Sequence, residues 1–472
     1  MATTKSLGTF TTCLAAALLA SSGAHAATPS ALYYGGPVTE NAKVYVVWWG
    51  DPAKINPVIT VAKGGIADFY AGVLNSSYMD WLNVYNTTSN AQAGSHNGMA
   101  GTGQRIGRGN YAGTLTLANV PTGNVTDAQV QSTIDQALDA GTLPPPDDNT
   151  LYAIYFPKAV SISLDGTTSC HGFGAYHNFI MESQRHAVYY AVMPDCGGSF
   201  SSITSVSSHE LMEAISDTVP TAGNMPDYPQ AWNDSMGSEI GDLCEGPTSA
   251  APVMTAFGTF TVQKMWDERS KSCTAFSSDA NDFNVAISPN AASVPLNGTM
   301  TFMIQTATSA GSPQMLSLSA NAPTGVSATV SPTMVMSGGT ATLTVTATNP
   351  SAQTGLQVVV RADAGAGSTV QTHTAALLLK TTSAPVDLGA PAMDLGVGAA
   401  DLATPPAGEG TPGDDLAVGG GVGGGGAQPG TSKGCGCVIG AAAGPSASPL
   451  AALVMLALVA LASRRRARRR RR

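Results

Sequence analysis

The stretch that decides how this chain folds reads Ser207-Ser208-His209-Glu210-Leu211-Met212-Glu213-Ala214-Ile215-Ser216-Asp217. As a helix, this stretch places His209, Glu213 and Asp217 on one side, with Glu210 about 100° away around the axis. Zinc hydrolases use this spacing: a histidine and a second ligand lie four residues apart, and a glutamate directly follows the histidine. The usual motif has His as the second ligand, whereas position 213 of this chain is Glu. In such sites two ligands share one helix face and the glutamate reaches a metal-bound water.

Histidine and acidic side chains outside the helix supply further donors. The helix should begin near Ser201 or Ser202 and stop before Pro220. A Gly-rich turn at 237–245 follows it, and a histidine-bearing loop at 170–178 precedes it. We expect the metal ligands to be His209, Glu213 and Glu239, with Asp242 and His177 as second choices, and Glu210 to be the catalytic general base.

The charge of these ligands affects the choice of cation. Ligation by His209, Glu213 and Glu239 would cancel both charges of zinc, so bound water would be a poorer acid and calcium would become more competitive. A neutral ligand from His177 weakens this objection. In the alternative without an ion, His209 and Glu213 pair with each other or with backbone groups inside a folded domain.

The N-terminus and the cysteines indicate export. Residues 1–26 have a positive start, a short apolar core and a small-residue cleavage site, which is the pattern of a signal peptide. Apart from Cys13 and a pair near the C-terminus, the chain has the cysteines Cys170, Cys196, Cys244 and Cys273. An even number in an exported chain predicts two disulfides, and we choose nearest-neighbour pairing over a cysteine-ligated zinc.

The C-terminal residues 434–472 carry three ordered elements: the Gly-Cys motif with Cys435 and Cys437, an apolar stretch at 438–462 and an Arg cluster at 464–472. The stretch is long enough for one transmembrane helix with an inside-positive stop. The arrangement resembles the myxobacterial-type C-terminal sorting tail, which implies processing by a sorting protease at the membrane. A plain tail-anchored helix is the alternative. Both place the protein at the cell surface, anchored to the membrane.

The rest of the chain divides into three parts. Residues 28–278 mix β-rich runs, such as 43–49, 151–156, 186–193 and 257–266, with helical patterns at 58–74, 127–140 and 201–216, which predicts an α/β or α+β core. Residues 282–380 alternate in the strand period and predict an all-β immunoglobulin-like sandwich. Residues 381–433, rich in Gly, Pro and Asp, predict a disordered linker.

Several motifs of the head occur in a fixed order: His209-Glu210-x-x-Glu213, Ser216-Asp217, Ala231-Trp232 and Glu239-Ile240-x-Asp242-x-Cys244-Glu245. This order resembles the EXORDIUM-like, phosphate-induced protein family of plants and its bacterial relatives. The resemblance extends to 44–50, to the Tyr176-His177 loop and to 262–266 followed by Cys273, and covers most of 28–278. It implies a secreted protein with a zincin-like head. One departure is Ser216-Asp217-Thr218, where relatives frequently carry Thr-Asp-Pro or Thr-Asn-Pro.

The excess of acidic residues excludes one class of partner. Outside the terminal Arg run the chain has 14 Lys and Arg against 31 Asp and Glu, so we expect no nucleic-acid partner. We therefore expect a secreted, surface-anchored protein that hydrolyses extracellular peptides with zinc. The alternative is a non-catalytic protein that binds a cell-surface ligand on the same scaffold, with a structural ion or none.

Overall fold

The computed structural model describes residues 29–181, 186–220, 226–349, 351–365 and 370–382. The predicted signal peptide (1–26), the linker beyond residue 382 and the predicted sorting tail (434–472), with Cys435 and Cys437, lie outside the described residues. Within the described ranges, no helix is both long and apolar enough to cross a membrane.

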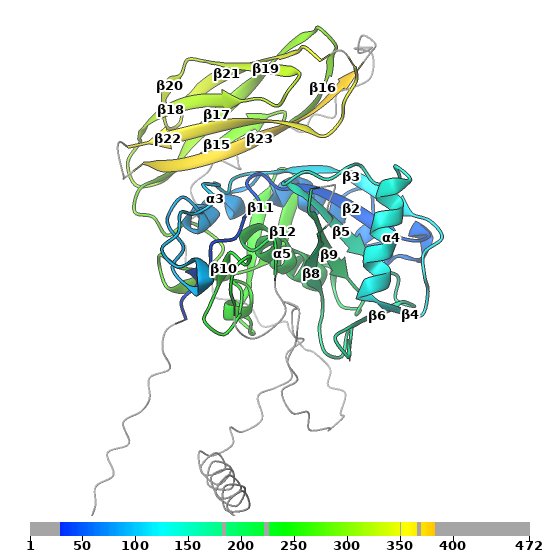
Figure 1. The fold of residues 1–472 in the computed structure, drawn as a ribbon. Coiled ribbons are helices and arrows are strands. Elements are labelled where there is room, and N and C mark those ends of the chain that lie inside the picture. The colour runs from blue at the N-terminus through cyan, green and yellow to red at the C-terminus, as the bar shows by residue number, and fades with distance from the viewer. Residues whose placement is uncertain (1–28, 182–185, 221–225, 350, 366–369, 383–472) are drawn as a thin grey trace, which may run out of the picture.

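A mixed five-stranded sheet forms the centre of the head (Figure 1). Its strand order is β3 (Asn110–Leu117), β2 (Lys43–Trp49), β5 (Thr150–Tyr155), β9 (Val188–Met193) and β8 (Tyr176–Ile180). The first four strands run parallel, whereas β8 pairs antiparallel with β9 and forms one edge. All residues of β2, β5 and β9 are buried, as expected for central strands covered on both faces.

The two faces of this sheet belong to two hydrophobic cores. Alternate residues of β2 belong to different cores. On one face of the sheet, Val44, Val46 and Trp48 pack with helices α2 (Ile66–Val73) and α5 (Phe200–Ser216). Tyr45, Val47 and Trp49 pack with helix α4 (Asp127–Asp139) on the other face. This division follows from the strand period of two residues.

Short elements surround the central sheet of the head. The small sheets pair β1 (Leu32–Tyr33) with β10 (Trp232–Asn233), β11 (Ala250–Thr255) with β12 (Gly258–Gln263), β13 (Met265–Asp267) with β14 (Ser272–Thr274), and β4 (Asn124–Thr126) with β6 (Ser161–Leu164) and β7 (Thr167–Thr168). The single-turn helices are η1 (Pro52–Lys54), α1 (Pro57–Thr60), α3 (Ser77–Asp80), η2 (Trp81–Tyr85), η3 (Gly94–His96) and η4 (Asp242–Cys244).

The prediction of an α/β, zincin-like head is wrong. Strands account for 40% of the described residues and helices for only 18%. The sequence patterns missed strands of two or three residues, such as β1, β10 and β14, because such short strands cannot show an alternating pattern. The chain is therefore mostly β-sheet, with few helices.

Residues 282–382 form a sandwich of two β-sheets (Figure 1). One sheet has the order β15 (Asp282–Ser288), β17 (Thr299–Ala310), β21 (Thr340–Ala347) and β19 (Val326–Ser331). The other has the order β16 (Ala291–Pro295), β23 (Gln371–Thr382), β22 (Leu356–Ala364), β18 (Met315–Asn321) and β20 (Met334–Met336). Alternate residues of both sheets point inward and enclose one hydrophobic core.

The sandwich packs directly against the head, and backbone bonds cross the boundary between them. Arg108 N–H donates to the Thr374 carbonyl at 2.9 Å, and Ala376 N–H donates to the Arg108 carbonyl at 3.2 Å, so Arg108 forms a bridge with Ala375 of β23. The buried Arg108 guanidinium binds the Asp80 carboxylate through two bonds of 2.8 and 2.7 Å. This buried ion pair therefore holds the residue at which the two parts meet.

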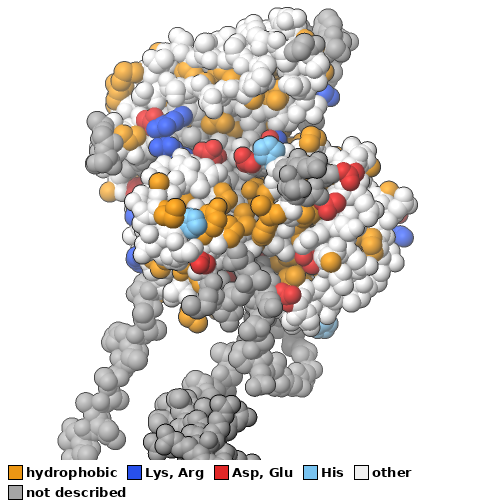
Figure 2. All heavy atoms as spheres, in the orientation of Figure 1, with side chains coloured by type: hydrophobic (Ala, Val, Ile, Leu, Met, Phe, Trp, Pro, Cys, Tyr) orange, Lys and Arg blue, Asp and Glu red, His pale blue; other side chains and the backbone are white. Residues whose placement is uncertain are grey.

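Side-chain amides extend this boundary. Gln357 Nε2 donates to the Asn41 carbonyl at 3.0 Å and to Asn110 Oδ1 at 2.9 Å, while Lys43 Nζ donates to the Gly355 carbonyl at 3.0 Å. Figure 2 shows charged side chains gathered along the same boundary. A cleft of about 780 Å³ lies there, lined by residues 40–41, 104–105 and 147–149 of the head and by 319–323 and 355–357 of the sandwich.

Candidate metal centre

Helix α5 carries the motif into the interior of the head. Its N-cap is Ser199, whose Oγ accepts a hydrogen bond from the Ser202 N–H at 3.2 Å. The helix ends at Ser216, and its C-cap is Asp217, whose N–H donates to the Glu213 carbonyl at 2.7 Å. Every residue from Ser207 to Ser216 is buried. The polar side chains of this segment therefore depend on partners within the fold.

A first group of donors comprises His209, Glu213 and Asp242, whose donor atoms all lie within 4.8 Å of one another. His209 Nε2 lies 3.0 Å from Glu213 Oε2 and 3.8 Å from Asp242 Oδ1. The His209 and Glu213 side chains are fully buried, whereas that of Asp242 is 25% exposed. This group therefore reaches solvent through Asp242.

A second group comprises His177, Glu213 and Glu239, with the same mutual separation of at most 4.8 Å. His177 comes from the edge strand β8, and its Nε2 lies 3.6 Å from Glu239 Oε1. His177 Nδ1 lies 4.0 Å from Glu213 Oε2 and 3.5 Å from Glu210 Oε2. All four side chains are at most 1% exposed.

Backbone groups of the turn at 240–242 fix the orientation of Glu213. Its Oε1 accepts hydrogen bonds from the N–H groups of Gly241 and Asp242, both at 3.1 Å. Gly241 sits so close that an added Cβ would lie 2.7 Å from both Glu213 Oε1 and His209 Nδ1. Gln263 Nε2 donates to the Gly241 carbonyl at 2.8 Å and holds the turn in place. Only a glycine fits beside the donors.

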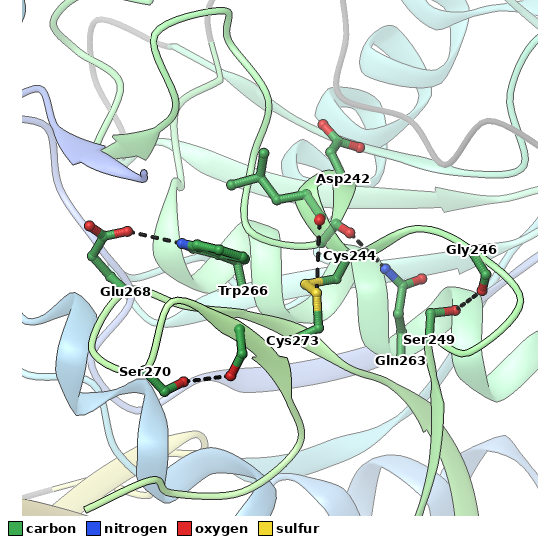
Figure 3. Close-up of a disulfide and its surroundings, with 12 residues drawn as sticks. Asp242, Cys244, Gly246, Ser249, Gln263, Trp266, Glu268, Ser270 and Cys273 are labelled. Atoms are coloured by element: carbon green, nitrogen blue, oxygen red, sulfur yellow. Dashed lines mark hydrogen bonds between the residues drawn. A yellow bond between two sulfur atoms is a disulfide. The ribbon is translucent and has the colours of Figure 1, made fainter. Parts of the chain in front are cut away.

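A disulfide anchors the same turn. Cys244 and Cys273 are bonded, and Figure 3 shows Asp242 on the turn of Cys244 with its carboxylate directed away from the sulfur atoms. The second disulfide joins Cys170 and Cys196. The structure thus forms both disulfides that nearest-neighbour pairing predicts. Disulfides form and persist in oxidising compartments, so the protein is extracellular.

The electrostatics of the cluster reflect its burial. Burial raises the pKa of Glu210, and burial together with the charge of Glu213 raises the pKa of Asp242 to about 8. Burial acts to raise the pKa of Glu213 as well, but His209 outweighs it, so that pKa is lowered. Burial acts to lower the pKa of His177, but Glu210 outweighs it, so that pKa is raised. Carboxylates in this interior therefore favour a nearby positive charge.

Asp217 does not join these groups, although the helix pattern places it on the side of His209 and Glu213. Its carboxylate accepts hydrogen bonds from the Ala231 N–H at 2.8 Å and from Asn233 Nδ2 at 2.6 Å. Burial raises its pKa to about 6. Asp217 therefore connects the end of α5 to the strand β10 instead of contributing a donor.

The donor set fits a divalent transition metal. The buried atoms that make no hydrogen bond within the described residues include both carboxylate oxygens of Glu210, Oε2 of Glu213 and Nδ1 of His177. Leaving such groups unsatisfied is costly, and a cation would satisfy them. Imidazole nitrogens combined with carboxylate oxygens suit zinc, whereas calcium prefers oxygen donors alone.

The structure brings together the residues that the sequence singled out. The predicted set of His209, Glu213 and Glu239 does not form one group, because His209 and Glu239 lie in different groups that share Glu213. The two second choices complete these groups, Asp242 with His209 and His177 with Glu239, and Glu210 lies beside His177. Sequence reasoning missed the positioning roles of Gly241 and Gln263. The Gly between Ile240 and Asp242 was the available signal, because a glycine beside acidic residues often marks a close approach of the backbone.

No protein-family model matches the chain, and no curated protein matches it. Among solved structures, domains 4 and 5 of the S-layer protein SbsC are 12% identical over 28% of this chain and 65% of that chain, with a TM-score of 0.17. A FixG-related protein from Vibrio parahaemolyticus is 10% identical over 21% of this chain and 97% of that chain, with a TM-score of 0.16. WR4, a C. elegans MSP family member, is 11% identical over 22% of this chain and 99% of that chain, with a TM-score of 0.16.

At these TM-scores the similarities support no conclusion about the fold or the function of this chain. The resemblance to the EXORDIUM-like family therefore stays a prediction from the sequence.

Proposed function

We propose that this extracellular protein is a metal-dependent hydrolase that acts on peptides. The observation that carries the proposal is the buried cluster in which His209, His177, Glu213, Glu239 and Asp242 place donor atoms around one region of the head. Zinc bound there would polarise a carbonyl group and make a water molecule more acidic.

Glu210 is the residue proposed to move the proton. It follows His209 directly on α5, and its carboxylate lies 3.5 Å from His177 Nδ1. Neither of its oxygens makes a hydrogen bond within the described residues. Burial raises its pKa, which brings the carboxylate closer to the range in which a general base works well. Glu210 thus accepts a proton from the attacking water.

The position of β8 supports a peptide as the substrate. This strand forms an edge of the central sheet and carries His177. Extended peptides bind to sheet edges through backbone hydrogen bonds. A peptide added along β8 would pass beside the donor cluster, which is the geometry that peptide hydrolysis needs.

The test compares two Glu→Gln variants of the purified protein on a broad peptide library. Glu210→Gln should lower kcat/KM by about 10²–10⁴-fold while the protein keeps its zinc, since general-base catalysis contributes on this order. Glu40→Gln makes the same chemical change at an exposed position outside both donor groups and should behave like the parent. Equal activity of Glu210→Gln and the parent would rule out the proposed base, and a protein without stoichiometric zinc would rule out the metal centre.

A second candidate is a non-catalytic binding protein in which the ion is structural. The observation that favours it is the burial of the donors, because His177, His209, Glu213 and Glu239 are at most 1% exposed. In this case removal of the metal by a chelator should lower the midpoint temperature of thermal unfolding and should not change the hydrolysis of the peptide library. The peptide library therefore separates the two candidates.

The cell-surface location is part of the same proposal. The C-terminal residues 434–472 would hold the protein at the membrane after processing by a sorting protease. Cell fractionation tests this step: full-length protein should be found with the membrane, and protein that ends before residue 434 should be found in the medium.

A further inference from the structure

Glu213 belongs to both donor groups. One group joins it to His209 and Asp242, and the other joins it to His177 and Glu239. Each group alone supplies three donor atoms within 4.8 Å of one another, and three protein ligands are the usual number in a catalytic zinc site. The cluster therefore holds enough donors for two ions.

The carboxylate of Glu213 is oriented to serve both groups. Its Oε1 accepts the N–H groups of Gly241 and Asp242, which leaves Oε2 for other partners. Oε2 makes no hydrogen bond within the described residues, and it lies 3.0 Å from His209 Nε2 and 4.0 Å from His177 Nδ1. A single oxygen thus faces a histidine from each group.

A backbone carbonyl lies on the other side of the His177 ring. The Nε2 of His177 is 3.2 Å from the carbonyl oxygen of Asp217. A carbonyl can only accept, so in the tautomer that forms this hydrogen bond Nε2 carries the proton, and Nδ1, which faces Glu210 and Glu213, has the lone pair that a metal needs. This arrangement, in which a carbonyl orients a histidine through its second nitrogen, is typical of metal ligands.

The negative charge of the cluster can accommodate more than one divalent cation. Glu210, Glu213, Glu239 and Asp242 carry up to four negative charges, and the first three side chains are fully buried. Burying uncompensated charge is costly, so nearby cations would stabilise the ionised carboxylates. Two divalent ions match four ionised carboxylates.

We propose that the cluster is a dinuclear site, in which Glu213 bridges one ion held by His209 and Asp242 and a second ion held by His177 and Glu239. The proposal rests on the metal-dependent function proposed above and specifies its cofactor as a pair of zinc ions. Ion pairs of this kind lie about 3.5–4 Å apart and polarise a substrate together, which compensates for the acidic ligands that weaken a single ion.

The first experiment is zinc stoichiometry by elemental mass spectrometry on the full, disulfide-bonded protein. The parent and the Glu40→Gln control should hold two zinc ions per chain. Asp242→Asn and Glu239→Gln should each reduce the content to one, and Glu213→Gln should weaken both. One ion in the parent overturns the dinuclear site and leaves the proposed function standing, whereas no ion overturns both.

The second experiment tests the dinuclear site on the parent protein alone and then on one variant. Parent protein loaded with manganese should give the electron paramagnetic resonance spectrum of two exchange-coupled ions. A spectrum of isolated manganese ions at full loading overturns the proposal. Asp242→Asn, whose side chain is 25% exposed and so tolerates the change best, should convert the coupled spectrum to the isolated one.

Discussion

Replacing Gly241 with alanine should disrupt the proposed metal centre without removing any of its proposed ligands. A Cβ at this position would lie 2.7 Å from Glu213 Oε1, 2.7 Å from His209 Nδ1 and 2.8 Å from His209 Cε1. Ordinary contacts begin at 3.4 Å, so both ligands must retreat by about 0.6–0.7 Å. The backbone itself tolerates alanine, because Gly241 has φ −79° and ψ −43°.

The size of the effect follows from these displacements. Ligand distances in a metal site are held to about 0.2 Å, so a shift three times larger should weaken zinc by about 10–100-fold, as loss of an orienting partner does. The crowding should also cost about 1–3 kcal/mol of unfolding free energy. In an uncrowded position with this backbone conformation, the same replacement would stabilise the protein by about 0.4–1 kcal/mol.

The assay is zinc competition against a chromophoric chelator, together with urea unfolding of the metal-free protein. Gly72→Ala is the matched control, because the added Cβ would also be crowded, at 2.3 Å from Thr255 Oγ1. Neither Gly72 nor Thr255 belongs to a donor group. The control should lose stability and keep its zinc affinity. If Gly241→Ala binds zinc as tightly as the parent, the turn does not set the ligand geometry and the reasoning fails.

Three further changes test the packing around the site and the sandwich. Burial acts to raise the pKa of Asp282, but its 2.8 Å hydrogen bond to His373 outweighs burial, so the pKa is lowered. The pair therefore adds stability above the unfolded pKa of about 4, and this stability is lost as the pH falls through the pKa of the folded state. Asp282→Asn should reduce the loss of unfolding free energy at acid pH in a series of urea-unfolding measurements. Arg108→Met leaves Asp80 buried without its bidentate partner and should cost about 3–5 kcal/mol in urea unfolding, part of which the added Asp80→Asn change should restore. Cys273→Ser opens the disulfide beside the metal cluster and should cost about 2–4 kcal/mol and weaken zinc in the chelator assay; an unchanged zinc affinity would mean that the disulfide does not hold the turn.

Long periodic segments of the head could be located from the sequence. The β-rich run at 43–49 coincides with β2 (Lys43–Trp49), and the helical pattern at 201–216 falls within α5, which begins one residue earlier because Ser199 is its cap. The balance of strand and helix could not be predicted, since the short strands of the small sheets lack any period. An apolar or polar residue pair alone does not distinguish a two-residue strand from a turn.

The members of the metal cluster could be proposed, but not their grouping. His209 and Glu213 share a helix, so their spacing fixes their relation. His177 lies 32 positions before His209 in the numbering, and nothing in that separation shows that β8 runs beside α5. The sharing of Glu213 between two groups likewise depends on backbone N–H groups of the 240–242 turn, which no side-chain pattern encodes.

Strand β23 has a mechanical consequence for the whole molecule. It pairs with β22 and β16 inside the sandwich, and its residues 374–376 also bond to Arg108 of the head. A pulling force applied at Thr382 therefore acts on a strand that is bonded to both the sandwich and the head. We therefore expect the two parts to move together under such a force, because β23 is bonded to both of them.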